Sequence, residues 1–220
     1  MALAMAEERV RVTAVSDYIC PWCYVGMARL ERVQRAFELE VTWHPFELHP
    51  GIPQEGRELG RRAEYYLRFL PIAAGAGLTF QPPARVPNSH LALEAAEFAR
   101  EQGAFDSYHR AVFEAYFAHE RNIGDPAVLA ELAGETGLDA RALRDALESK
   151  RYASLVDERT EEAKGWEVSA TPTFIFESGE RRFALSGAQD DAVFESVAQR
   201  MGAARRTAPL GAAGRSPERR

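Results

Sequence analysis

Two cysteines, Cys20 and Cys23, are the only cysteines of the 220-residue chain, and they flank Pro21 and Trp22 in a Cys-Pro-Trp-Cys segment. A redox-active dithiol needs two sulfur atoms that can close a small ring and also separate without moving the backbone, and this spacing permits both. Pro21 suits the first position of a helix, because its missing N–H costs nothing there. We therefore expect a helix to begin at the pair, and we expect the pair to carry out thiol–disulfide exchange.

The two sulfur atoms should differ in reactivity. At a helix start, unpaired backbone N–H groups and the positive end of the helix dipole favour a thiolate, which lowers the pKa of Cys20 and makes it the nucleophile. Cys23 lies on an apolar stripe with Met27 and Leu30, so we expect it to be shielded and to resolve the mixed disulfide. The indole of Trp22 adds no positive charge but offers an apolar contact for substrate.

Two other roles compete with redox chemistry. Together with His44 and His49, the cysteines form a C-x2-C…H-x4-H string of the kind that holds zinc. The gap from Cys23 to His44 is longer than the usual finger spacing, and Pro45 and Pro50 keep the two histidines off one helix face. An inert pair of buried thiols is the second competitor. We expect redox chemistry, with no bound metal.

The elements that must position the pair form a β-α-β unit at the start of the chain and a β-β-α unit at its end, separated by a long helical stretch. Strands are predicted at residues 10–15, 39–43, 173–176 and 182–185. Helices are predicted at residues 21–37, 58–69, 89–102, 105–119, 126–137, 152–164 and 193–201. A further helix is predicted to begin after a cap at Asp139. Residues 71–87, rich in Gly and Pro, are predicted to be a connection.

This order predicts an α/β protein with a thioredoxin-like fold, in which a four-stranded sheet has helices on both faces and a large all-helical domain is inserted. We place the thioredoxin-like domain at residues 9–55 and 165–202, and the helical insertion domain at residues 56–164. Residues 203–220, which hold five arginines and one glutamate, are predicted to be a disordered basic tail.

The second half of the expected site is Thr171-Pro172, directly before the returning strand. In a thioredoxin-like fold, a cis-proline loop packs against the dithiol at this place, so we expect this bond to be cis and Pro172 to belong to the catalytic group. The backbone N–H and C=O of Thr171 would stay open to pair with an extended peptide, and its hydroxyl could bond the Cys20 thiolate. Pro21, Trp22 and Thr171 would then form the substrate-binding surface.

Several motifs resemble one family. The segments Ser16 to Gly26, Trp43 to Leu48, Ala115 to Asp125, Thr171 to Phe174 and Ser186 to Gln189 are similar to the DsbA-like family, in particular to its FrnE-type cytoplasmic branch. The resemblance covers about residues 10 to 200. It implies a thioredoxin domain with an inserted helical domain, and thiol–disulfide exchange by the first cysteine. Thr171 stands where many members have Val, a choice similar to that of disulfide isomerases.

A sister branch, similar to 2-hydroxychromene-2-carboxylate isomerase and kappa-class glutathione transferases, uses the same fold to hold glutathione. It typically has Ser at the first site position, where this chain has Cys20. A glutathione-dependent isomerase or transferase acting on an aromatic small molecule therefore stays open as an alternative. The resemblance would place Asn88 and Ser89 near the glutathione, which is also a candidate co-substrate for the dithiol. A non-enzymatic binding module that uses an apolar groove of the insertion is a third hypothesis.

Composition limits the partners. The net charge is −6, and the basic residues near the C-terminus leave the body still more acidic, so a nucleic-acid partner is not expected. The N-terminal segment has no basic region before its short apolar run, and no run approaches the length of a membrane span. We expect a cytoplasmic protein that acts on protein or small-thiol disulfides, with no membrane partner. A homodimer stays open. The lone histidines His90, His109 and His119 are interpreted as residues without a catalytic role.

Overall fold

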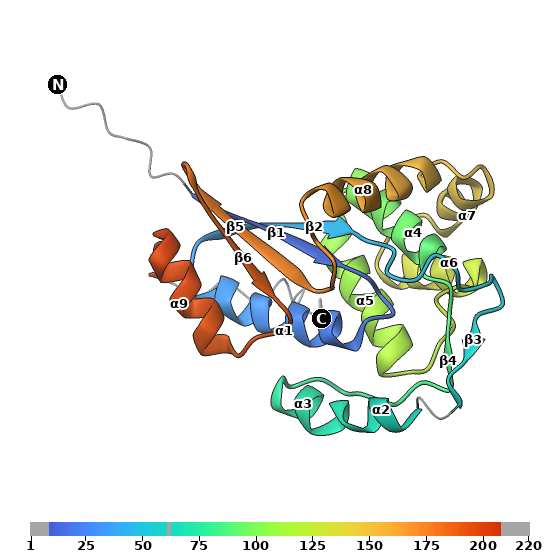
Figure 1. Cartoon of the computed structure of the whole chain (residues 1–220). Helices are drawn as coiled ribbons and strands as arrows, with labels where there is room; N and C mark the ends of the chain where they lie inside the picture. Colours follow the sequence, from blue (N-terminus) through green and yellow to red (C-terminus); the bar gives the residue numbers. More distant parts are fainter. Residues whose placement is uncertain (1–8, 61–62, 208–220) are drawn as a thin grey trace, which may run out of the picture.

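The computed structural model describes residues 9–60 and 63–207 (Figure 1). Its main sheet has the strand order β2-β1-β5-β6, with β1 parallel to β2 and antiparallel to β5. The strands of this sheet are β1 (Val10–Ser16), β2 (Leu39–Pro45), β5 (Thr173–Ser178) and β6 (Arg181–Ser186). The thioredoxin-like fold is thereby confirmed, as a mixed α/β sheet interrupted in sequence by a helical stretch between β2 and β5.

Most of the predicted helices are present, with boundaries within a few residues of those expected. In chain order they are α1 (Pro21–Ala36), α2 (Ala63–Leu67), α3 (Phe69–Gly75), α4 (His90–Glu101), α5 (Phe105–Phe117), α6 (Pro126–Glu135), α7 (Ala140–Glu148), α8 (Ala153–Gly165) and α9 (Asp191–Met201). The side chains of Asp125 and Asp139 cap α6 and α7 by accepting from backbone N–H groups of the first turn. None of the helices in the described part of the chain is long and apolar enough to cross a membrane.

Helices cover both faces of the main sheet. Helices α1 and α9 lie on one face (Figure 1), where Phe174 and Phe176 of β5 pack against Phe194 of α9. Alternate residues of the same strands point the other way, so Val15 and Ile175 pack with Ala163 of α8. The two central strands, β1 and β5, are therefore buried on both faces along most of their lengths, which explains their apolar character, whereas the edge strand β6 is mostly exposed.

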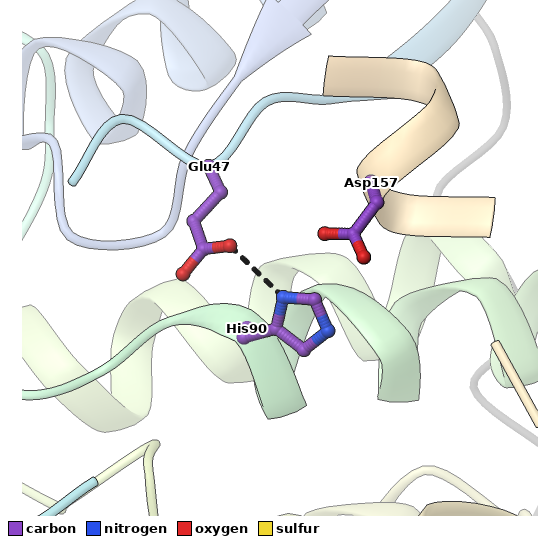
Figure 2. Close-up of side chains that lie close together, drawn as sticks. All are labelled: Glu47, His90 and Asp157. Carbon is purple, nitrogen blue, oxygen red and sulfur yellow. Dashed lines mark hydrogen bonds and ion pairs between the residues drawn. The ribbon is translucent and has the colours of Figure 1, made fainter. Parts of the chain in front are cut away.

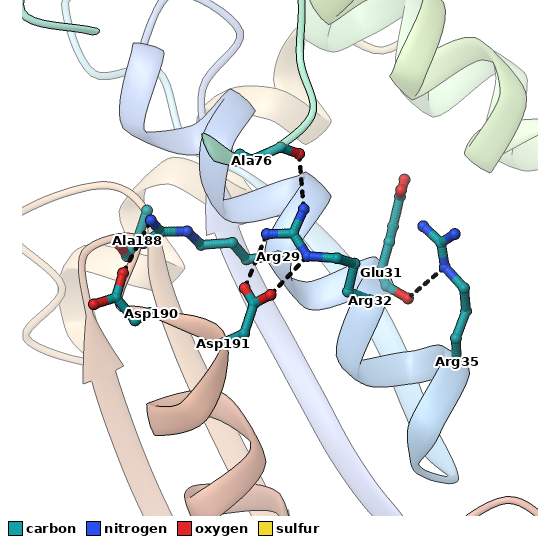
Figure 3. Close-up of polar contacts among 8 residues, drawn as sticks. All are labelled: Arg29, Glu31, Arg32, Arg35, Ala76, Ala188, Asp190 and Asp191. Atoms are coloured by element: carbon teal, nitrogen blue, oxygen red, sulfur yellow. Dashed lines mark hydrogen bonds and ion pairs between the residues drawn. The ribbon is translucent and has the colours of Figure 1, made fainter. Parts of the chain in front are cut away.

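Arginines on α1 fix that helix to its neighbours (Figure 3). Arg32 donates to both carboxylate oxygens of Asp191, at 2.7 and 3.0 Å, and to the backbone oxygen of Ala76 at 2.7 Å. Arg29 donates to the backbone oxygen of Ala188 at 2.5 Å and pairs with Asp190 at 3.0 Å. Hydrogen bonds and ion pairs thus connect the start of α9 and the end of α3 to α1, the helix that begins at the cysteines.

Two expectations about the insertion were wrong. Pro71 does not end the helical region, because it stands in the first turn of α3, where a helix needs no N–H. The insertion is also not all helical, since β3 (Arg57–Glu58) and β4 (Arg85–Val86) form a short antiparallel ladder. Strands of two residues are too short to show an alternating pattern, so they could not be predicted from the sequence.

The prediction of disorder from residue 203 onward is wrong for residues 203–207. The Glu38 N–H donates to the backbone oxygen of Ala204 at 2.8 Å, and Arg205 forms an isolated antiparallel bridge with Phe37. The Arg206 side chain donates to backbone oxygens at the end of α1. Residues up to 207 therefore have a defined place beside α1. The rest of the predicted tail, 208–220, lies outside the described residues.

The close approach of α1 to β5 is testable at Gly26. A Cβ atom there would lie 2.9 Å from Cζ of Phe174 and 3.2 Å from Cγ of Pro172, whereas one at Gly134 of α6 would meet nothing within 4 Å. Alanine normally stabilises a helix relative to glycine by up to about 1 kcal/mol, which is the gain expected for Gly134→Ala. Gly26→Ala should instead lower the free energy of unfolding by about 1–3 kcal/mol through overpacking. Urea denaturation measures both, and equal gains would contradict the tight contact.

Candidate active site

Cys20 is the N-cap residue of α1. Its backbone is extended, with φ −89° and ψ 112°, and Pro21 follows at the first helical position as predicted. The Cys20 carbonyl accepts from the N–H of Cys23 at 3.0 Å and of Tyr24 at 3.4 Å, which closes the first turn. Both cysteines are free thiols, and both are buried. Cys23 is completely inaccessible to solvent, and Cys20 is 5% exposed. The pair is therefore a dithiol with only its first sulfur near the surface.

The two thiols have pKa values shifted in opposite directions. A hydrogen bond from Cys23 lowers the pKa of Cys20, against the effect of burial, and the Thr171 hydroxyl and the Cys23 N–H act in the same direction. Burial, followed by the hydrogen bond and the charge of Cys20, raises the pKa of Cys23 well above its ordinary value. This is the difference that a nucleophilic first thiol and a shielded second thiol require.

The Thr171–Pro172 bond is cis, as expected, and its loop lies against the dithiol. The Cys20 Sγ–H donates to the backbone oxygen of Thr171 over 3.4 Å. That carbonyl was expected to be open, but in this dithiol state it is occupied by the thiol. The Thr171 hydroxyl is buried and has no other partner in the described structure, so it is free to bond a Cys20 thiolate. The next residue, Thr173, uses its hydroxyl elsewhere, on the backbone oxygen of Ala170.

A groove of about 560 Å³ opens beside Cys20. It is lined by Ile19, Cys20, Pro21, Trp22, Leu48, His49, Ile52, Arg57, Leu59, Tyr65, Tyr66, Val86, Ser169, Ala170 and Thr171. The expected substrate-binding residues Pro21, Trp22 and Thr171 are thus brought together with the first cysteine. Trp22 donates from its indole N–H to the Tyr65 hydroxyl at 3.2 Å, so it also joins α1 to α2. The groove is mainly apolar, with Arg57 as its strongest positive group.

A buried carboxyl, Asp17, lies beneath the site and was not predicted. It accepts the Leu48 N–H at 2.7 Å and the Ile19 N–H at 3.3 Å, and the Ser89 hydroxyl bonds it as well. Burial raises the pKa of Asp17 to about 6, and its negative charge raises the pKa of Cys20. The available signal was an acidic residue three positions before the first cysteine, at the end of an apolar strand.

Asn88 and Ser89, suggested for glutathione, and His44, suggested for zinc, are placed away from the groove, whereas His49 lines it. Asn88 donates to the backbone oxygen of Ile52 at 2.7 Å and accepts the His90 N–H at 2.9 Å, and neither Asn88 nor Ser89 lines the groove. His44 bonds the backbone oxygen of Arg159 at 2.8 Å and lies at a different cavity. Within residues 9–60 and 63–207, the cysteines and histidines of the proposed zinc string do not form a metal-binding group.

Comparison with known proteins agrees with this geometry. Residues 11–199 match the model of the DSBA-like thioredoxin domain, and the chain belongs to this family. It is 33% identical over 194 residues to the uncharacterized protein YwbO of Bacillus subtilis (strain 168), covering 86% of this chain and 95% of that one. The crystal structure of the probable DsbA oxidoreductase SCO1869 from Streptomyces coelicolor is 29% identical, with a TM-score of 0.79, over 88% of this chain and 90% of that chain.

The sister branch shares the fold. The structure of 2-hydroxychromene-2-carboxylate isomerase is 20% identical and superposes with a TM-score of 0.71, over 87% of this chain and 95% of that chain. At this identity the likeness concerns the fold alone. The chemistry must be argued from the residues at the start of α1.

The role of the Thr171 hydroxyl can be tested by Thr171→Val, which keeps the shape and removes the oxygen. Because that hydroxyl lowers the pKa of Cys20, the variant should titrate Cys20 at higher pH, with less thiolate at pH 7. Thiolate absorbance near 240 nm followed against pH measures this. Thr173→Val is the matched control and should leave the Cys20 titration unchanged. An unchanged titration in Thr171→Val would contradict the assignment.

Asp17 predicts a specific pH dependence of stability. Its pKa is about 6 in the folded chain against 3.8 for an unperturbed aspartate, so the folded state binds the proton more tightly. Stability from this group is present at low pH and is lost as the pH rises from about 4 to 6, by roughly 3 kcal/mol in all. Asp17→Asn cannot titrate. The unfolding free energy of wild type minus that of Asp17→Asn should therefore fall between pH 4 and pH 8 in chemical denaturation, and a flat or rising difference would refute the shift.

Proposed function

We propose that this protein catalyses thiol–disulfide exchange, with Cys20 as nucleophile and Cys23 as resolving cysteine. The observation that carries the proposal is the position of two free thiols at the start of α1, where the first thiol contacts the loop of Thr171 and Pro172. The opposed directions of their pKa shifts support it. Family membership agrees with an oxidoreductase. The redox-active Cys20–Cys23 pair serves as the reactive group, without a bound cofactor.

The reaction balances as two successive displacements. The Cys20 thiolate attacks one sulfur of a substrate disulfide, a mixed disulfide forms, and the other substrate sulfur leaves as a thiolate. Cys23 then loses its proton and attacks the Cys20 sulfur. This forms the Cys20–Cys23 disulfide and releases the substrate fully reduced by two electrons. Run backwards, the same steps oxidise a substrate dithiol, and a combination of both isomerises a protein with mispaired disulfides.

Stabilisation of the Cys20 thiolate affects the direction. Each interaction that favours the thiolate stabilises the dithiol form of the protein, so it makes the Cys20–Cys23 disulfide easier to reduce. The Thr171 hydroxyl and the hydrogen bond from Cys23 act this way, and the charge of Asp17 opposes them. The reduction potential of the Cys20–Cys23 pair therefore depends on the balance of these effects. Glutathione is a suitable small-thiol co-substrate that returns the pair to its starting state.

The groove supports an extended peptide or a small disulfide as substrate. Its mainly apolar wall, with Trp22, Tyr65 and Tyr66, suits apolar side chains near a cystine. When the Cys20 thiol gives up its proton, the Thr171 carbonyl loses its donor and can accept from a peptide N–H. We infer a FrnE-type enzyme that works in the cytoplasm on protein or small-thiol disulfides.

The two cysteines give distinguishable variants. Cys20→Ser should abolish insulin reduction coupled to dithiothreitol, because no nucleophile is left at the groove. Cys23→Ser should instead accumulate a mixed disulfide with the substrate, because nothing releases it, and intact-mass spectrometry under non-reducing conditions detects that adduct. Full activity in Cys20→Ser would end the proposal.

Glutathione-dependent isomerisation of an aromatic small molecule is the second candidate, favoured by the mainly apolar groove that Arg57 helps to line. Glutathione supplies its own thiol in that chemistry, and the related branch has Ser at the first site position. Isomerase activity should therefore survive Cys20→Ser. The same variant separates the two candidates.

A further inference from the structure

A second cluster of titratable side chains lies away from the dithiol (Figure 2). Glu47 follows β2, His90 is the first residue of α4, and Asp157 belongs to α8. One ligand atom from each lies within 4.8 Å of the others, and their polar groups face a common space. Glu47 is buried, His90 is half-buried and Asp157 is exposed, so the cluster opens to solvent on one side.

A simple ion pair accounts for only part of this cluster. His90 Nδ1 lies 2.9 Å from Glu47 Oε2, which is a normal histidine–carboxylate contact. The carboxylates of Asp157 and of Glu94, which lies one turn further along α4, must share the same imidazole. One histidine thus faces three acidic side chains. Lys150 is the basic residue whose charge reaches Glu94. Additional positive charge beyond the one histidine would stabilise the buried carboxylates of Glu47 and Glu94.

Glu94 supplies an independent observation. Its side chain is 2% exposed, and its Oε1 lies 3.5 Å from His90 Nε2, on the ring edge away from Glu47. Its Oε2 is buried with no hydrogen-bond partner among the described residues, although a backbone hydrogen bond from Tyr152 acts on the same carboxylate. The carboxylate therefore faces the cluster from inside, and the charge of Asp157 reaches it. A carboxylate on the far nitrogen of a histidine is the usual partner of a metal-binding imidazole, because it orients the ring and fixes the tautomer.

Hydrogen bonds from backbone N–H groups to side chains outside the cluster help to hold these segments in place. The Glu47 N–H donates to the Thr160 hydroxyl at 3.0 Å, and Thr160 is three residues after Asp157 on α8. The His90 N–H donates to the Asn88 side chain at 2.9 Å, which fixes the start of α4. The ligand atoms are thus brought together before any ion arrives, which is the condition for a strong site.

We propose that Glu47, His90 and Asp157 bind one divalent transition-metal cation, through His90 Nδ1 and the two carboxylates, with Glu94 as the partner of His90 Nε2. One imidazole with carboxylates suits Mn²⁺, Fe²⁺ or Zn²⁺, whereas Mg²⁺ and Ca²⁺ prefer oxygen ligands alone. Bound metal would neutralise the buried carboxylates and join the segment after β2 to α4 and α8.

Mn²⁺ is the suitable probe, because it prefers oxygen and nitrogen ligands and the cysteine thiols compete little for it. The free ion has a strong electron paramagnetic resonance signal that binding diminishes. Titrated into the full chain, Mn²⁺ should occupy one saturable site per molecule and raise the melting temperature. Neither effect involves Cys20 or Cys23, so failure of the proposed exchange reaction would leave this result unaffected.

Asp157→Asn is the decisive variant, since the residue is exposed and its change spares the fold. It should weaken Mn²⁺ binding by at least about tenfold and abolish the thermal shift. Glu158→Gln removes the same charge from the next, exposed position of α8 and should bind like wild type. No saturable Mn²⁺ binding by wild type, or equal affinity in wild type and Asp157→Asn, would overturn the proposal.

Discussion

Strand direction is the constraint on which the site depends. Strand β1 is antiparallel to β5, and Val15 near the end of β1 is paired with Thr173 at the start of β5. The chain leaving β1 and the chain entering β5 must therefore meet at one edge of the sheet. Cys20 follows the first strand by four residues, and Pro172 directly precedes the second. Two segments about 150 residues apart in sequence are in this way forced together.

Close packing converts that meeting into contact between reactive groups. Gly26 lets α1 approach Phe174 and Pro172 to distances that a Cβ atom would not allow. The start of α1 then lies near enough to the loop for the Cys20 thiol to bond the Thr171 backbone oxygen. A helix held a little farther away would keep its dipole but lose the Thr171 contribution to the low pKa of Cys20. The low pKa of Cys20 therefore depends on how closely α1 packs against β5.

The sequence could predict those parts of the fold whose signals are local. Alternating or β-branched runs indicated the four main strands, and Pro21 indicated where α1 begins. The elements that were missed depend on distant partners: β3 forms because β4 lies beside it, and residues 203–207 are ordered because the end of α1 offers them hydrogen bonds. Asp17 stands close to the cysteines in sequence, yet only its burial gives it chemical interest.

The same distinction applies to the cluster of Glu47, His90 and Asp157. Its members come from three distant segments, and none stands in a spacing pattern that indicates a metal. His90 and Glu94 at i and i+4 are a common pair on helix surfaces, so they indicated only that two side chains share a face. Only the tertiary structure shows that this face of α4 lies against the segment after β2.

That segment after β2 links the dithiol to the helical insertion. Its three successive N–H groups bond two other parts of the chain. Phe46 donates to the carbonyl of Ser16 at the end of β1 and Leu48 to the carboxylate of the next residue, Asp17, whereas Glu47 donates to Thr160 of α8. Leu48 also lines the groove. Thr160 of α8 and Asp17, whose charge opposes the Cys20 thiolate, are thus bonded to adjacent residues of one short segment. Since β2 is parallel to β1, this segment leaves the sheet at the same edge as the cysteines. A helix of the insertion and the carboxylate next to the redox pair are therefore connected through two adjacent residues, without a contact to either sulfur.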